Sequence, residues 1–161
     1  MKLPSARSIR LVLTTLGFAG LIVALSAAPA TATLGNGFST TVLGRGTNQS
    51  HGTIPITQGL DVVVVQNTIA VGGYSGWHSH PGGAIVVVQA GQITTHESEG
   101  NHCVVTTYTA GQTFVEGAGK RLNAVNTGTI PTITVVAFPG VAVGAPGPTA
   151  WRTDEPDPGN C

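Results

Sequence analysis

Charged and aromatic residues are scarce in this chain. Lys, Arg, Asp and Glu make up 9% of its 161 residues, and Phe, Trp and Tyr make up 5%, beside 41% hydrophobic residues. So few charges exclude a highly charged disordered protein, and a formal net charge of zero excludes a strongly basic nucleic-acid-binding surface. The length corresponds to about one domain.

Glycine and proline, the two residues that interrupt helices, are abundant in this chain. The chain has 23 Gly and 10 Pro. In a helix interior Gly costs about 1 kcal/mol and Pro about 3 kcal/mol relative to Ala. This composition argues against a helical bundle and favours a β protein rich in turns.

Acidic residues are absent from the first 60 positions, whereas three of the seven basic residues precede a largely apolar run over residues 11–28. This pattern predicts a secretory signal peptide over residues 1–32, cleaved after Ala30 or Ala32, and therefore a secreted or cell-envelope protein. An uncleaved membrane anchor is the alternative, but the run is marginal for the roughly 20 residues that a span needs. After cleavage, four basic residues remain against seven acidic ones, a net charge of about −3, so we expect neither membrane nor nucleic-acid binding.

Only two cysteines are present, Cys103 and Cys161. In an oxidising compartment such a pair persists as a disulfide, so export predicts a Cys103–Cys161 bridge. Closing a loop of this length stabilises the fold by about 4 kcal/mol in the chain-entropy model and would tie the Pro- and Gly-rich tail, residues 141–161, to the body. Two free thiols are the alternative.

Long helical periodicities are absent after residue 32, and short runs rich in Val, Ile and Thr recur at spacings of about 8 to 12 residues. Gly pairs and Asn- or Gly-containing turns separate them. The pattern is typical of an antiparallel sandwich or barrel. It predicts strands at Asp61–Val71, Trp77–His80, Ala84–Gln89, Gln92–His96, His102–Tyr108, Thr113–Val115, Leu122–Asn126 and Thr132–Phe138. Residues 33–53 are expected to form a linker with one edge strand near Thr40–Leu43.

His78 and His80 stand two positions apart on a predicted strand. Side chains at i and i+2 point to the same face, so both imidazoles can reach one metal ion inside a barrel. The alternative is a pair of hydrogen-bonded polar residues in an apolar interior. A metalloprotease helix at His96 to His102 is excluded, because the second His comes six positions later instead of four and Gly100 interrupts the segment.

The surrounding residues resemble the cupin superfamily. Its first motif, G-x5-H-x-H-x3-4-E-x6-G, is matched from Gly72 through His78 and His80 to Gly91, with Ala84 in the Glu position. Its second motif, G-x5-P-x-G-x2-H-x3-N, is matched from Gly111 to Asn126, with Gly117 for Pro and Leu122 for His. The stretches GWHSHPG, AGQTFVEGAG and PDPGNC are similar to those of small exported bacterial cupin-domain proteins. The resemblance implies an all-β jelly-roll barrel of two antiparallel sheets, with a cupin domain over residues 54–140.

Two of the four metal ligands that the resemblance implies are missing, because Ala84 and Leu122 cannot ligate. Two imidazoles predict a weakly held divalent ion, Fe, Mn, Ni or Zn, unless another donor completes the site. The candidates are Glu116, His96, His102 and His51. Glu116 follows Phe114 by two residues and could face inward, but its ordinary interpretation is a turn carboxylate in solvent. Lys120 and Arg121, near the missing His, could serve an anionic ligand or could be solvated turn cations.

Two functions of different classes are compatible with these residues. The sequence favours an exported cupin-fold protein with an incomplete metal site at His78 and His80, which binds a small molecule or weakly a divalent metal ion, and it leaves open whether the protein is catalytic. The alternative is a metal-dependent small-molecule enzyme, dioxygenase-like or isomerase-like, for which the sequence offers no acid–base pair beside the histidines. A homodimer formed by barrel edges is compatible with both functions.

Overall fold

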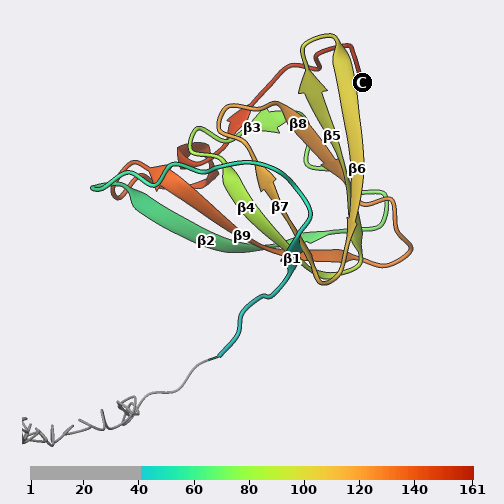
Figure 1. Ribbon diagram of the computed structural model, residues 1–161, viewed down its shortest axis with the longest axis horizontal. Coiled ribbons are helices and arrows are strands. Elements are labelled where there is room, and N and C mark those ends of the chain that lie inside the picture. Colours follow the sequence, from blue (N-terminus) through green and yellow to red (C-terminus); the bar gives the residue numbers. More distant parts are fainter. Residues whose placement is uncertain (1–40) are drawn as a thin grey trace, which may run out of the picture. The chain divides into compact units, whose positions relative to one another are not determined.

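The computed structural model describes residues 41–161, so the predicted signal peptide lies outside the described residues. This part of the chain is all-β, as expected: it forms ten strands, one short 3-10 helix and no α-helix. None of its segments is a helix of the length and apolarity that crossing a membrane requires. The strands make two five-stranded sheets that face each other (Figure 1).

The first sheet has the strand order β1-β7-β4-β9-β2, and the second has the order β10-β3-β8-β5-β6. All pairings are antiparallel except that of β1 with β7, which is parallel. The first sheet contains β1 (Thr47–Asn48), β2 (Asp61–Ile69), β4 (Ala84–Ala90), β7 (Gln112–Glu116) and β9 (Thr132–Val141). The second contains β3 (His78–Ser79), β5 (Gln92–Glu99), β6 (His102–Thr109), β8 (Leu122–Val125) and β10 (Thr153–Asp154).

Alternating burial places the core between the sheets. Along β4, Ala84, Val86 and Val88 are buried while Ile85 faces outward, and β9 alternates in the same way. Side chains at alternate positions of a strand point to one face, so these residues line the inner face of the first sheet. Tyr108 of β6 stacks on Phe114 of β7, with ring centroids 4.2 Å apart, and closes the core between the two sheets.

The predicted edge strand near Thr40–Leu43 is wrong for its described residues, because residues 41–43 form no strand. The edge strand is β1, which begins at Thr47, four residues after the predicted strand ends. A Cβ on Gly46 would lie 2.7 Å from the backbone oxygen of Gln112, so glycine is what permits the chain to approach β7 at this point. The amide of Thr47 then donates to Gly111 O at 2.8 Å, which starts the parallel pairing.

The C-terminal segment is tied to the body by the predicted disulfide, and it also contributes a strand to the second sheet, which the sequence did not indicate. After the 3-10 helix η1 (Pro148–Ala150), β10 pairs with β3, so that Asp154 lies opposite His78. Farther on, Cys161 forms the disulfide with Cys103 of β6, with a Cα–Cα distance of 5.1 Å. The C-terminal segment is therefore attached at both edges of the second sheet, to β3 by strand pairing and to β6 by the disulfide.

Candidate metal centre

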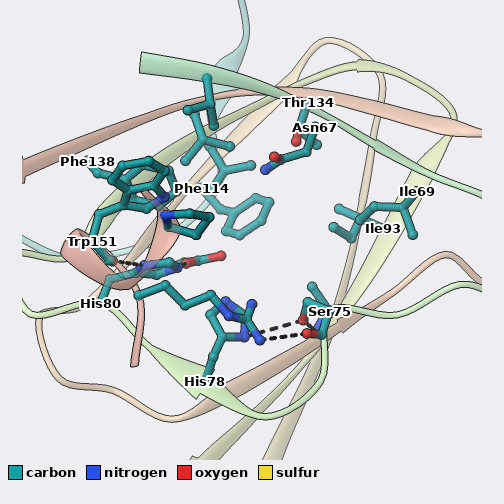
Figure 2. A pocket seen from close by; sticks show the side chains of 17 residues that line it. Asn67, Ile69, Ser75, His78, His80, Ile93, Phe114, Thr134, Phe138 and Trp151 are labelled. Atoms are coloured by element: carbon teal, nitrogen blue, oxygen red, sulfur yellow. Dashed lines mark hydrogen bonds and ion pairs between the residues drawn. The ribbon is translucent and has the colours of Figure 1, made fainter. Parts of the chain in front are cut away.

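His78, His80 and Glu116 converge on the interior of the barrel. One potential ligand atom from each residue lies within 4.8 Å of the others, and all three residues are buried. Strand β3 and the residue that follows it supply the two histidines, and the end of β7 supplies the carboxylate. The three side chains line one cavity, which Figure 2 shows with His78 and His80 at one end.

His78 is oriented by the loop that precedes it. Its Nδ1 lies 2.8 Å from the carbonyl oxygen of Gly76 and 3.3 Å from Oγ of Ser75. A carbonyl oxygen only accepts, so Nδ1 carries the hydrogen and Nε2 has a free lone pair in the neutral ring. Burial lowers the pKa of His78, an effect that outweighs the opposing backbone hydrogen bond to Gly76 and the negative charge of Glu116. The neutral, metal-binding form is thus favoured.

His80 is oriented by the C-terminal segment. Its Nδ1 donates to the carbonyl oxygen of Trp151 at 2.5 Å, which again leaves Nε2 as the free ring nitrogen. The ring also packs against Phe138, with centroids 4.6 Å apart, and Phe138 stacks on Trp151. Metal-binding histidines usually donate their second ring N–H to a carbonyl or carboxylate, which fixes ring orientation and tautomer. Both histidines here meet that condition.

Glu116 is the donor that the two cupin motifs do not supply. It follows Phe114 by two positions on β7, and both side chains are buried, with Glu116 only 7% exposed. The interpretation of Glu116 as a turn carboxylate in solvent is therefore wrong. In the β4–β7 ladder, Glu116 is the direct antiparallel partner of Ala84, the residue in the Glu position of the first motif. Directly paired residues project to the same face of a sheet. Glu116 therefore places a carboxylate on the face where the first motif has a Glu and this chain has Ala84.

The chemistry of the donor set suits a divalent metal ion. Two donors each about 2.1 Å from one ion are at most about 4.2 Å apart, so the observed spread of up to 4.8 Å requires a small side-chain movement. Glu116 Oε2 lies 3.0 Å from Nε2 of His80, yet this buried oxygen has no hydrogen-bond partner in the described part of the chain. Two donors bound at right angles, each about 2.1 Å from one ion, are also about 3.0 Å apart. Three bare donors facing each other in a buried site are costly unless a cation or a proton lies between them. Two His and one carboxylate form a recognised set for Fe, Mn, Ni or Zn.

A tight glycine turn joins the two halves of the site. The amides of Gly83 and Gly119 both donate to the carbonyl oxygen of His80, at 3.0 and 2.9 Å. Gly83 has φ 76°, and a Cβ there would lie 2.7 Å from the backbone oxygen of Glu116. Glycine is therefore needed both for the backbone conformation and for the close approach of β7, which brings Glu116 beside His80.

The cavity has a volume of about 220 Å³. Its walls are mainly apolar and come from both sheets, with a few polar groups besides the three candidate ligands. Figure 2 shows Asn67 and Thr134 at the end away from His78, and Ser75 near it. The apolar walls are formed mainly by Val86, Ile93, Phe114, Val136, Phe138 and Trp151. Such a chamber can hold a small molecule beside the three candidate ligands.

The other candidate ligands lie away from the cavity. His51 and His102 are exposed, and His96 is half-buried at a position of β5 whose parity is opposite to that of cavity-lining Ile93. Lys120 bonds Glu99 at 2.7 Å and Arg121 lies 3.3 Å from Glu155, with the two basic side chains 45% and 48% exposed. Both are exposed cations with acidic partners, in agreement with their interpretation as solvated turn cations.

Sequence reasoning missed three contributors to the site: Ser75, Trp151 and Arg152. Ser75 and Arg152 line the cavity near His78, and Trp151 both lines it and accepts the hydrogen bond from His80. Trp151 acts through its backbone carbonyl, which carries no sequence signal. A strand of two residues gives no periodicity either, so the return of residues 148–154 to the cavity was not predictable from local patterns.

The family model described as Cupin domain matches residues 66–138. Residues 66–138 form a cupin domain. This region contains both histidines, Glu116 and most of the cavity wall. The cupin resemblance and the all-β fold expected from the sequence are confirmed. The C-terminal residues Trp151 and Arg152 lie outside the matched region.

Several solved structures are similar to this chain. An oxalate oxidase is 27% identical, with coverage of 47% of this chain and 40% of the oxidase chain, at a TM-score of 0.45. A protein with a double-stranded beta-helix domain from Klebsiella pneumoniae is 28% identical, with coverage of 52% and 66%, at a TM-score of 0.42. An oxalate decarboxylase from Lactobacillus farciminis is 16% identical, with coverage of 59% and 27%, at 0.48. The chain thus spans under half of the oxalate oxidase. No curated protein matches it.

Proposed function

We propose that this cupin domain binds one divalent metal ion through His78, His80 and Glu116 and that the ion holds a small molecule in the cavity. The observation that carries the proposal is the buried Glu116 carboxylate, which faces two oriented Nε2 atoms and has an oxygen without a hydrogen-bond partner. Three protein ligands leave open coordination positions, as in metal sites that take up a ligand or substrate. The third donor also implies firmer metal binding than the two histidines alone predict.

The residues around the site favour binding over acid–base catalysis. The ionisable side chains of the cavity are His78, His80, Glu116 and Arg152. With the first three engaged as ligands, a positioned group that could take or give a proton near neutral pH is absent from the described lining, since an Arg guanidinium stays charged. The Ser75 hydroxyl and the Arg152 guanidinium can orient a ligand.

A metal-dependent enzyme is the second candidate function, because the three-ligand set with open positions also suits catalysis. When bound, an ion of this class supplies Lewis-acid polarisation or redox chemistry that needs no acid–base pair from the protein. The chain's residues would then bind and orient the substrate. The apolar walls formed by Phe114 and Phe138 would exclude water from it.

Metal analysis of the purified protein tests the proposal. After dialysis against Mn, Fe, Ni and Zn in separate experiments, we expect one ion per chain, with affinity rising from Mn and Fe to Ni. A His78→Ala/His80→Ala variant should lose this ion. The matched control is a His96→Ala/His102→Ala variant, which removes two histidines outside the cavity and should keep it. The proposal is wrong if both variants retain equal metal or if the unaltered protein binds none at micromolar concentration.

We also infer that the protein is exported. The disulfide between Cys103 and Cys161 supports this inference weakly, because such bridges persist mainly in oxidising compartments. The basic start and apolar run over residues 1–32 support it from the sequence.

The homodimer stays a prediction. Strand β2 is an edge strand of its sheet among the described residues and exposes Val62 and Val64, which are 52% and 57% exposed. Unpaired edges of this kind are available for pairing with a second copy. The molar mass measured by light scattering during size-exclusion chromatography, compared between the unaltered protein and a Val64→Lys variant, decides this point.

A further inference from the structure

Arg152 is a cation at the metal end of the cavity. It follows η1 and Trp151 and lines the same cavity as His78 and Ser75. Its Nη2 donates to the carbonyl oxygen of Ser75 at 2.7 Å, and its Nε donates to Oδ1 of Asp154 at 2.7 Å. Ser75 is in turn the neighbour of His78 Nδ1, so the guanidinium is anchored beside one of the candidate metal ligands.

The guanidinium of Arg152 has N–H donors that these two hydrogen bonds do not use. An arginine side chain offers five N–H donors in a planar fork, and the two contacts described engage Nε and Nη2. Nη1 remains for another partner. Held on one side by Ser75 and Asp154, the fork has a fixed orientation, so little side-chain entropy is lost when it binds a planar anionic group.

The charge of the cavity favours an anionic ligand. Its charged lining consists of Glu116 and Arg152, which cancel, so a bound divalent ion leaves a net charge of about +2. Asp154 offsets part of this charge from outside, where its side chain is 84% exposed and screened by water. The positive charge lies against mainly apolar walls, and a carboxylate that reaches both the ion and Arg152 would compensate it.

The size and walls of the cavity restrict the rest of the ligand. A cavity of 150 Å³ lined by Leu, Ile and Phe is large enough for benzene, and this one has a volume of about 220 Å³. Between the metal end and Asn67, the walls are mainly apolar (Figure 2). The far end of the cavity offers the neutral polar groups of Asn67 and Thr134 but no cation, so a second carboxylate on the ligand would lack a charged partner there. The ligand that fits has one carboxylate and an apolar body of benzoate size.

We propose that Arg152 and the metal ion together bind the carboxylate of a small monocarboxylic acid with an apolar body. This inference rests on the proposed metal site. It assigns ligand specificity to a residue of the C-terminal segment, outside the residues that match the cupin model. The segment then has two roles, since Trp151 orients His80 and Arg152 selects the ligand.

Isothermal titration of the metal-loaded protein with matched ligand pairs tests this inference. The probes are benzoate against benzamide and hexanoate against hexanamide, which differ in charge but hardly in size. We expect each acid to bind at least about tenfold more tightly than its amide, because the acid accepts a charge-assisted hydrogen bond from Arg152 that the neutral amide cannot match. The Arg152→Gln variant should lose most of this preference. The control is Arg121→Gln, which removes an exposed cation outside the cavity and should preserve it.

The outcomes separate this inference from the metal site itself. Metal content is measured first on each protein. If the ion binds but acid and amide have equal affinity for the unaltered protein, the anion inference is overturned and the metal site stands. If Arg152→Gln keeps the full preference, Arg152 is not the selecting residue and the inference is also overturned. If no ion binds, both fall. If Arg152→Gln does not fold, the comparison of acid with amide on the unaltered protein still tests whether the cavity selects an anion.

Discussion

Ala84 and Glu116 lie directly opposite each other in the β4–β7 ladder. Ala84 occupies the Glu position of the first cupin motif, and Glu116 supplies a buried carboxylate 3.0 Å from His80 Nε2. Compared with the first cupin motif, this site has a carboxylate on the same face of the same sheet, but a residue of the neighbouring strand carries it.

This pairing predicts that a carboxylate at position 84 can replace the one at position 116 as a metal ligand. Glu116→Ala should lower metal affinity at least about tenfold, because one of three ligands is lost. The double variant Ala84→Glu/Glu116→Ala should regain most of it, since the alanine at position 116 leaves room for the new side chain. Metal affinity is measured by competition with a chromophoric chelator. Glu97→Gln, at an acidic residue paired with Lys120 outside the cavity, is the control and should bind as the unaltered protein does.

The disulfide should support the metal site through Trp151. Replacing both cysteines, Cys103→Ser/Cys161→Ser, should lower the free energy of unfolding by about 4 kcal/mol in the chain-entropy model. Greater freedom of the C-terminal segment weakens the hydrogen bond from His80 to Trp151, so metal affinity should fall about tenfold. Denaturant titration and chelator competition measure the two effects. Unchanged metal affinity in a destabilised variant would show that the segment holds His80 without the disulfide.

The stability of the metal-free protein should depend on His78 in a defined pH range. Burial lowers the folded-state pKa of His78 below its ordinary value of 6.5, so the unfolded chain takes up its proton first as the pH falls. The stabilising contribution of the neutral ring is present above about pH 6.5 and is lost as the pH falls toward the lowered folded-state pKa. Urea titrations in a chelator between pH 7.5 and 5 should therefore give a smaller loss for His78→Gln than for the unaltered protein. Parallel losses would contradict the assignment.

Export predicts a defined mature N-terminus. Expressed from its full sequence in a secreting host, the protein should be recovered outside the cytoplasm beginning at Thr31 or Thr33, which follow the two expected cleavage sites. Intact mass spectrometry distinguishes these ends from each other and from the uncleaved chain. Recovery of the whole chain in the membrane fraction would support the anchor instead.

Much of the barrel was predictable from the sequence, because half-buried strands alternate in polarity and turns carry Gly and Asn. Strands such as β2 and β4 begin at the residues expected, Asp61 and Ala84. The predicted strand near residues 41–43 was wrong because the edge strand β1 has only two residues. Its position depends on the close approach of Gly46 to β7, which composition does not reveal.

The site was predictable only in part. His78 and His80 follow from strand periodicity and the first motif. Glu116 had a signal, its two-residue spacing from Phe114, but a Gly-rich turn follows it directly and favoured the solvent interpretation. The roles of Trp151 and Arg152 depend on the pairing of β10 with β3, between residues more than 70 positions apart, and no local pattern encodes that contact.

The most direct test of the three-ligand metal centre is a crystal structure of the protein soaked with Zn or Mn, with the ion located by its anomalous signal. We predict one ion in the barrel, bound by Nε2 of His78, Nε2 of His80 and a carboxylate oxygen of Glu116, each at about 2.0–2.2 Å. An ion held by the two histidines while Glu116 turns away, or ions found only at exposed His51 or His102, would contradict this account.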